Sequence, residues 1–234
     1  MYREIDFIQL IETLQRLENR IMERFPDSGL MKVCQELNAM VQDTQTKLVW
    51  VSKPNLWLRS IVAVVIALVF FLIAYSFLAV DFTLPTFQFA ELIQVAESAV
   101  NEVILIGAAL FFLVTLEAKL KRSRILTALN ELRAVAHVID MHQLTKDPTE
   151  IGEGNFHTKS SPKRNMTPYQ LKRYLDYCSE MLSLVGKVAA VYAQKFPESD
   201  VVSAVNEVEN LTTGLSRKVW QKLIILEQRT LVTN

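Results

Sequence analysis

The hydrophobic pattern of the chain is dominated by a run of twenty-one uncharged residues, Ser60 to Val80. At ~1.5 Å of rise per helical residue, this run is long enough to cross a hydrocarbon core of ~30 Å. A backbone in lipid must satisfy its own N–H and C=O groups, and an α-helix does so. The pattern therefore predicts a membrane-spanning helix over about residues 58–80.

A second apolar run, Val103 to Leu116, contains only fourteen uncharged residues. A re-entrant segment would need an irregular reversal inside the membrane, but the run has no proline and a single glycine, Gly107. We therefore expect a second span over about residues 98–118, which brings Asn101 and Glu102 about one turn inside the outer boundary. An ionisable group at that depth is a functional-site hypothesis. The alternative is that Glu102 only extends to the outer headgroups.

Charge is distributed unequally around the two runs. The segment between them, residues 81–102, contains four carboxylates and no Lys or Arg, whereas basic residues flank the pair on the other side. The positive-inside rule then places both termini in the cytoplasm and makes the chain a multi-pass protein of a cell (inner) membrane. Four basic residues after the second run are a candidate site for anionic lipid, with a simple topology signal as the alternative; they are Lys119, Lys121, Arg122 and Arg124.

Before the first run, the pattern changes to single apolar stripes at helical spacing. Residues 1–56 are predicted to form an αα-hairpin, broken where Pro26 bars a continuous helix and Ser28 caps the next one. The stripe of the first helix consists of Ile5, Ile8, Leu10, Ile11, Leu14, Leu17 and Ile21. The stripe of the second, with alternating spacings of four and three, consists of Leu30, Cys34, Leu37, Val41, Thr44 and Leu48.

After the second run, the helical spacing continues over residues 119–145, with apolar positions at Ile125, Leu129, Leu132, Ala136 and Ile139. Residues 146–166 are polar and predict a loop. Thr167 followed by Pro168 is typical of a helix start, so residues 167–234 predict a second αα-hairpin. Its first helix has a stripe of Leu171, Leu175, Cys178, Met181, Leu182 and Val185, and its second has Val201, Val205, Val208, Thr212, Leu215 and Val219.

The two hairpins share a register. Phe196-Pro197-Glu198-Ser199 repeats the chemistry of Phe25-Pro26-Asp27-Ser28, and each position of the last stripe lies 171 residues after its counterpart in the stripe that begins at Leu30. Internal duplication of an αα-hairpin is one explanation. The other is chance, because such caps and heptad-like stripes are common.

These elements predict an all-α integral membrane protein. Its transmembrane part, residues 57–118, is a two-helix hairpin with an acidic external loop, and the N- and C-terminal αα-hairpins form a cytoplasmic helical bundle. Two spans enclose no interior of their own, so a homo-oligomer is expected. The chain has 25 basic and 25 acidic residues, which gives no bulk attraction to nucleic acid. Both cysteines fall on the cytoplasmic side, where a structural disulfide is not expected.

Two further groups of side chains suggest ligand chemistry. His137, Asp140 and His142 are the only clustered metal-type ligands, but their spacing is a weak metal signal, and an exposed or interface-packed histidine pair near a helix end is the alternative. Lys163 and Arg164 precede the helix that begins at Pro168 and are a candidate anion-binding pair, with a solvated basic loop as the alternative.

Three functional classes remain. The first is an ion-conducting, cation-preferring pore, in which Glu97, Asn101 and Glu102 form the outer mouth and Gly107 allows close helix contact. The second is a non-conducting scaffold whose bundle recruits a cytoplasmic protein. The third is a membrane-attached enzyme, which is not expected, because the sequence has no nucleophile motif, phosphate-binding glycine loop or paired carboxylates. No cofactor is expected.

Overall fold

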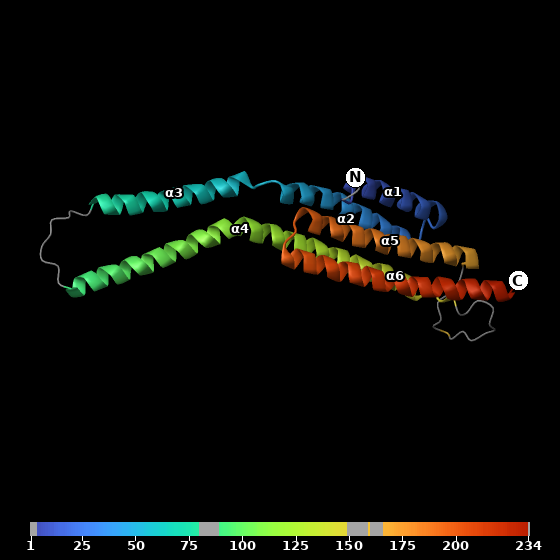
Figure 1. Ribbon diagram of the computed structural model, residues 1–234. Helices are drawn as coiled ribbons and strands as arrows, with labels where there is room; N and C mark the ends of the chain where they lie inside the picture. Colours follow the sequence, from blue (N-terminus) through green and yellow to red (C-terminus); the bar gives the residue numbers. More distant parts are fainter. Residues whose placement is uncertain (1–3, 80–88, 149–158, 160–165, 234) are drawn as a thin grey trace. The chain divides into compact units, whose positions relative to one another are not determined.

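The computed structural model describes residues 4–79, 89–148, 159 and 166–233 (Figure 1). The described part of the chain contains six α-helices and no strand, which confirms the all-α prediction. In chain order they are α1 (Phe7–Arg24), α2 (Gly29–Ser52), α3 (Leu56–Ala79), α4 (Phe89–Leu144), α5 (Pro168–Lys195) and α6 (Ser199–Thr233).

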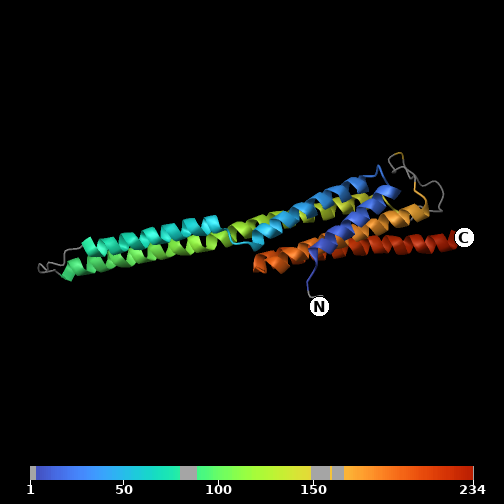
Figure 2. The same ribbon diagram turned by 90° about the horizontal axis from the view of Figure 1, so that it is seen from above.

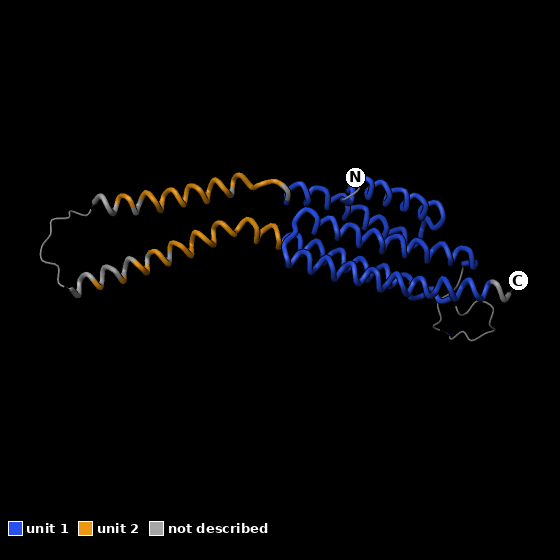
Figure 3. Tube along the Cα trace, viewed as in Figure 1, with its two compact units in different colours: residues 1–52, 124–234 blue, residues 53–123 orange. Residues whose placement is uncertain are grey.

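The helices belong to two compact units, which Figure 3 distinguishes by colour. Unit 1 consists of residues 1–52 and 124–234, and unit 2 consists of residues 53–123. The long helix α4 contributes to both, since its first part lies in unit 2 and its last part in unit 1. Each unit is described below by itself.

The helix ends of unit 1 follow the local chemistry of the sequence. The Asp6 carboxylate accepts the amide protons of Ile8 and Gln9 and so caps α1, while the Ser28 hydroxyl accepts from the amide of Met31 at 3.1 Å at the start of α2. At the start of α5, Thr167 and Gln170 form a reciprocal capping box, with Pro168 at the first helical position. The predicted caps at Ser28 and Thr167 are therefore confirmed.

The core of unit 1 is built from the predicted stripes. All six positions of the α2 stripe and all six of the α6 stripe are buried, as are the five apolar positions predicted in the last part of α4. In α1 the prediction is only partly right: Leu10, Leu14, Leu17 and Ile21 are buried, but Ile5 and Ile8 are exposed. These two isoleucines lie where the chain enters the helix, at the edge of the bundle rather than in its core.

Helix α5 is the central element of the bundle. It packs against α1, α2 and α6, and fourteen of its residues are buried (Figures 1 and 2). The last part of α4 pairs with α2 through Lys47 and Glu131, whose charged atoms are 3.3 Å apart, and contributes Ile125 to Ile139 to the same core. The predicted helical bundle is thus present, with five helical segments surrounding one apolar interior.

Unit 2 contains α3 and the first part of α4, and it exposes many large apolar side chains. The side chains of Val64, Leu68 and Phe71 on α3 and of Phe111 on α4 are all more than half exposed. Among the described residues, none of the six helices offers a stretch both long and apolar enough to cross a bilayer. Several positions of the two predicted spans lie outside the described side chains.

Candidate functional site

A groove opens on the surface of unit 1 where α1, α5 and α6 meet. The groove has a volume of about 720 Å³ and is open to the surface. Its apolar walls come from Ile5, which precedes α1, from Leu10 of α1, Leu184 of α5, and Trp220 and Leu223 of α6. Trp220 is 60% exposed, which is a large apolar surface for a position on a bundle helix.

The floor of the groove is the polar strip of α5. Its members repeat at intervals of three and four residues, so they lie on one face of the helix; they are Asp176, Ser179, Glu180, Ser183 and Lys187. The two serine side chains are small, so they fill little of the groove. Lys187 Nζ donates to the Ser183 hydroxyl at 2.5 Å. Fourteen other residues of α5 are buried, whereas Ser183 and Lys187 of this strip are exposed and its other members are partly exposed.

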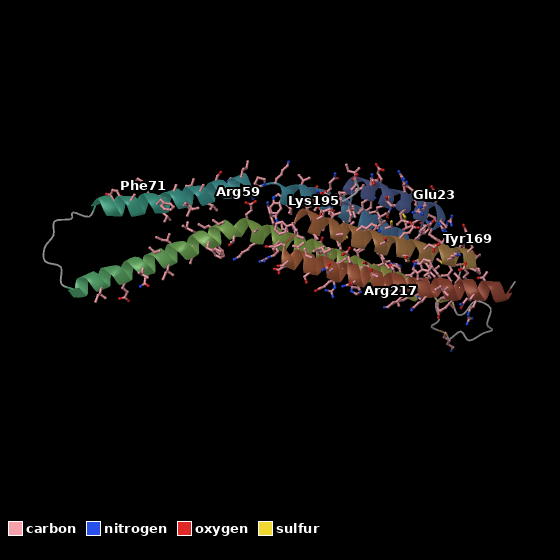
Figure 4. All side chains as sticks on the ribbon, viewed as in Figure 1. Glu23, Arg59, Phe71, Tyr169, Lys195 and Arg217 are labelled. Carbon is pink, nitrogen blue, oxygen red and sulfur yellow. The ribbon has the colours of Figure 1, made fainter. Side chains whose placement is uncertain are left out.

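Ion pairs hold the rim of the groove. Arg20 of α1 donates to both carboxylate oxygens of Glu180, at 2.5 and 3.3 Å, which ties α1 to α5. Lys195 lies 3.5 Å from Glu4, and Figure 4 shows it at the opposite end of α5 from Tyr169. Three of the four carboxylates in the lining are ion-paired, Glu180 with Arg20, Asp176 with Arg173 and Glu4 with Lys195, so most of the negative charge of the groove is neutralised.

The three candidate metal ligands have different surroundings. His137 is exposed, the Asp140 carboxylate accepts from the Gln143 amide at 2.6 Å, and His142 is half-buried beside Gly29. Burial and the nearby Lys146 ammonium lower the pKa of His142. Within the described part of the chain, no three His, Cys, Asp or Glu side chains are grouped to hold a metal ion.

Both cysteines are packed in the core. Cys34 on α2 and Cys178 on α5 are free thiols with no exposed surface. Burial raises the pKa of the Cys178 thiol to about 12, and burial with the nearby Glu18 carboxylate does the same for Cys34. A thiol with so high a pKa is protonated at neutral pH and is a poor nucleophile.

The basic residues predicted to contact anionic lipid do not form one exposed group. Lys121 is buried: it donates to the backbone oxygen of Lys53 at 2.8 Å and lies 2.8 Å from the Glu117 carboxylate. The Lys121 ammonium group is therefore paired inside unit 2, and its contact with anionic lipid stays a prediction. Lys119 is exposed and lies over the Phe112 ring. In unit 1, Arg124 stacks on Trp50, with its guanidinium carbon 4.1 Å from the ring centroid.

Sequence reasoning missed the partner of Lys121. Glu117 accepts from the Asn55 backbone amide at 3.1 Å and from Arg59 Nε at 2.8 Å, in addition to pairing with Lys121. This cluster joins the start of α3 to α4. A signal for it was present in the sequence, because Arg59 and Glu117 are the charges that border the two apolar runs on the same predicted side.

The residues predicted for an outer mouth are only partly described. Glu97 and Asn101 are exposed on α4, and a Cβ atom at Gly107 would meet open space. The Glu102 side chain lies outside the described residues, as do Lys163 and Arg164 of the predicted anion site. Compared with known proteins, the chain matches no family model, and no curated protein or solved structure is significantly similar to it.

Proposed function

We propose that this protein is a membrane-anchored helical scaffold. In this proposal, residues 58–80 and 98–118 insert as the two-span hairpin expected from the full sequence, both termini lie in the cytoplasm, and the bundle of unit 1 recruits a cytoplasmic protein. The groove between α1, α5 and α6 is the surface that favours recruitment over the other functional classes.

The observation that carries the proposal is the contrast between the two units. In unit 1 the buried stripes are apolar and exposed faces carry charges such as Arg16, Glu131 and Arg217. In unit 2 the large exposed side chains of α3 are apolar or aromatic, and they include Ile61, Val64, Leu68, Phe70, Phe71 and Tyr75. A helix that is apolar on all sides needs an apolar environment, which a bilayer supplies.

Membrane insertion is tested by alkaline extraction and vesicle flotation of the full chain. We expect the wild-type protein to stay with membranes and to float with vesicles. A charge at the middle of the first span, Leu68→Arg, should reduce insertion, since arginine there costs ~2.5–3.5 kcal/mol. The matched control is Leu144→Arg at the end of α4, where the side chain is already exposed. Release of the wild-type chain into the soluble fraction would sink the proposal.

A cation-preferring pore is the second candidate. It is favoured by the exposed Glu97 and Asn101 side chains on α4, by the open space at Gly107, and by the wholly acidic segment between the apolar runs. It requires a homo-oligomer, because two spans cannot surround a path. Planar-bilayer recording tests it: absence of current, or a Glu102→Gln variant with unchanged ion selectivity, would rule out the role assigned to Glu102.

A further inference from the structure

Unit 2 contains a cavity of about 350 Å³ between α3 and α4. Its walls are apolar on both sides, with Val62, Ala63 and Ile66 on one helix and Leu113 and Val114 on the other. The wall residues of α3 follow Arg59 at helical spacing, so the cavity begins directly beside that guanidinium. Figure 4 places Arg59 near the start of α3 and Phe71 farther along it. The volume falls at the lower end of the range for ligand pockets, ~300–1,000 Å³.

The polar end of the cavity is fixed by Glu117. Its carboxylate accepts from the Asn55 amide and from Arg59 Nε and pairs with Lys121, whose side chain is only 9% exposed. These contacts neutralise the carboxylate and hold the guanidinium in place. Among the described residues, Arg59 gives only its Nε to this cluster, and its side chain is 63% exposed. Both Nη groups are then available to a further acceptor.

The charge around this end is strongly positive. Residues 53–59 and 117–122 together contain five basic residues and one carboxylate, and that carboxylate is already paired. A guanidinium with free Nη groups matches the geometry of phosphate oxygens. An apolar slot that ends at an anion-binding guanidinium fits a ligand with an anionic head and a hydrocarbon tail.

We propose that this cavity binds one anionic phospholipid, with its phosphate on Arg59 and part of an acyl chain between Ala63 and Leu113. The inference rests on the proposed membrane anchoring, which brings the cavity to the level of the lipid headgroups. It differs from a diffuse attraction of basic residues to the leaflet, because it assigns one site, one guanidinium and one apolar wall. In this site Arg59, rather than the paired Lys121, contacts the phosphate.

The experiment is native mass spectrometry of the full chain, released from nanodiscs that contain equal amounts of phosphatidylglycerol and phosphatidylcholine. We expect one phosphatidylglycerol retained per chain in the wild type. Arg59→Gln should reduce that retention about tenfold. The matched control, Lys119→Gln, removes the same charge from the same region but from a residue that does not line the cavity, and it should retain the lipid.

The apolar wall is tested in the same way. Ala63→Phe fills the slot and should abolish retention, whereas Ala67→Phe, one turn along α3 and outside the lining, should not. Soluble glycerol phosphate is the third ligand to test, because it has the phosphate of the headgroup but no acyl chain. If it binds as well as the lipid and Ala63→Phe leaves its binding unchanged, the site is a phosphate site and the lipid assignment is wrong.

The other possible outcomes test the lipid site and membrane anchoring separately. Equal losses for Arg59→Gln and Lys119→Gln, or no preference for phosphatidylglycerol, would show only diffuse leaflet attraction and overturn the inference. A wild-type chain that floats with vesicles but retains no lipid overturns the lipid site and leaves membrane anchoring intact. A chain that does not float at all overturns both, and flotation is measured first so that the two failures are distinguished.

Discussion

Phe25 and Phe196 end their helices in the same backbone conformation, 171 residues apart. Their φ and ψ angles are −137° and 59° for Phe25 and −143° and 78° for Phe196. Each donates its amide proton to the carbonyl four residues before it, Ile21 at 2.7 Å and Tyr192 at 2.9 Å. The shared register of the two αα-hairpins therefore extends to the end of the first helix in each. The turns that follow differ, because the Phe25 carbonyl accepts from the Ser28 amide whereas the Phe196 carbonyl accepts from the Glu198 amide.

The two phenylalanines should nevertheless contribute unequally to stability. Phe25 is buried and packs edge-on against Tyr174, with ring centroids 5.5 Å apart, whereas Phe196 is only partly buried. Phe25→Ala should destabilise the fold by about 3–5 kcal/mol, the range for large core truncations. Phe196→Ala should lower the free energy of unfolding clearly less. Denaturant unfolding followed by circular dichroism measures both, and equal losses would contradict the burial argument.

A buried hydrogen bond joins the two hairpins. Tyr192 of α5 donates its hydroxyl proton to Thr44 Oγ1 of α2 at 3.1 Å, and Thr44 in turn donates to the Met40 carbonyl. Thr44→Val leaves the tyrosine hydroxyl buried without its acceptor, which costs about 1–3 kcal/mol. Tyr192→Phe should cost about 1 kcal/mol, because Thr44 keeps its bond to Met40. The double variant should cost less than the sum, and strict additivity would show that the bond contributes nothing.

Two glycines provide a matched pair. A Cβ atom at Gly29 would lie 2.3 Å from His142 Cε1, so Gly29→Ala forces the imidazole out of its packed position. We expect a loss of about 1–3 kcal/mol, as for other overpacked sites. Gly214 lies within α6 with open space around it, and Gly214→Ala should stabilise the protein by about 0.5–1 kcal/mol through helix propensity. Thermal unfolding of the two variants should shift in opposite directions.

His142 should make stability depend on pH. Burial and the Lys146 charge lower its pKa in the folded state, so the unfolded chain binds the proton more readily. The contribution is therefore fully present above the unfolded pKa of about 6.5 and is lost as the pH falls through the folded pKa. His142→Gln should flatten the fall in melting temperature between pH 7 and pH 5. The control is His137→Gln at an exposed position, and an equal flattening there would contradict the assignment to His142.

The parts of the fold that were predictable depend on neighbours within one or two helical turns. The burial of Val201, Val205 and Thr212 follows from spacing alone, because an apolar face on a helix must be covered. The caps at Ser28 and Thr167 follow from hydroxyl chemistry next to Pro. The burial of Ile8 was also expected from periodicity, but this residue is exposed, because periodicity does not reveal where the bundle ends.

The candidate sites were less predictable because they depend on partners far along the chain. Lys121 looked like a lipid-facing residue in the sequence, but the fold brings it to Lys53 and Glu117 and buries it. The groove was not predicted at all. Its floor reads in the sequence as the solvated polar face of an ordinary amphipathic helix, and only the placement of α1 and α6 makes it a groove wall.

By itself, the sequence determined that this protein is helical, that helices begin after Ser28 and Thr167, which faces of α2 and α6 are buried, and that residues 60–80 carry no charge. The start of α4 was not predicted, because the second apolar helix was expected from about residue 98 and α4 begins at Phe89. The tertiary structure decided which face of α5 lines the groove and that Glu117 pairs with both Arg59 and Lys121. The physical reason is the distance along the chain over which each interaction acts. Helical periodicity and capping act over three to four residues, whereas Arg20 with Glu180 and Asn55 with Glu117 are brought together only by packing of whole helices.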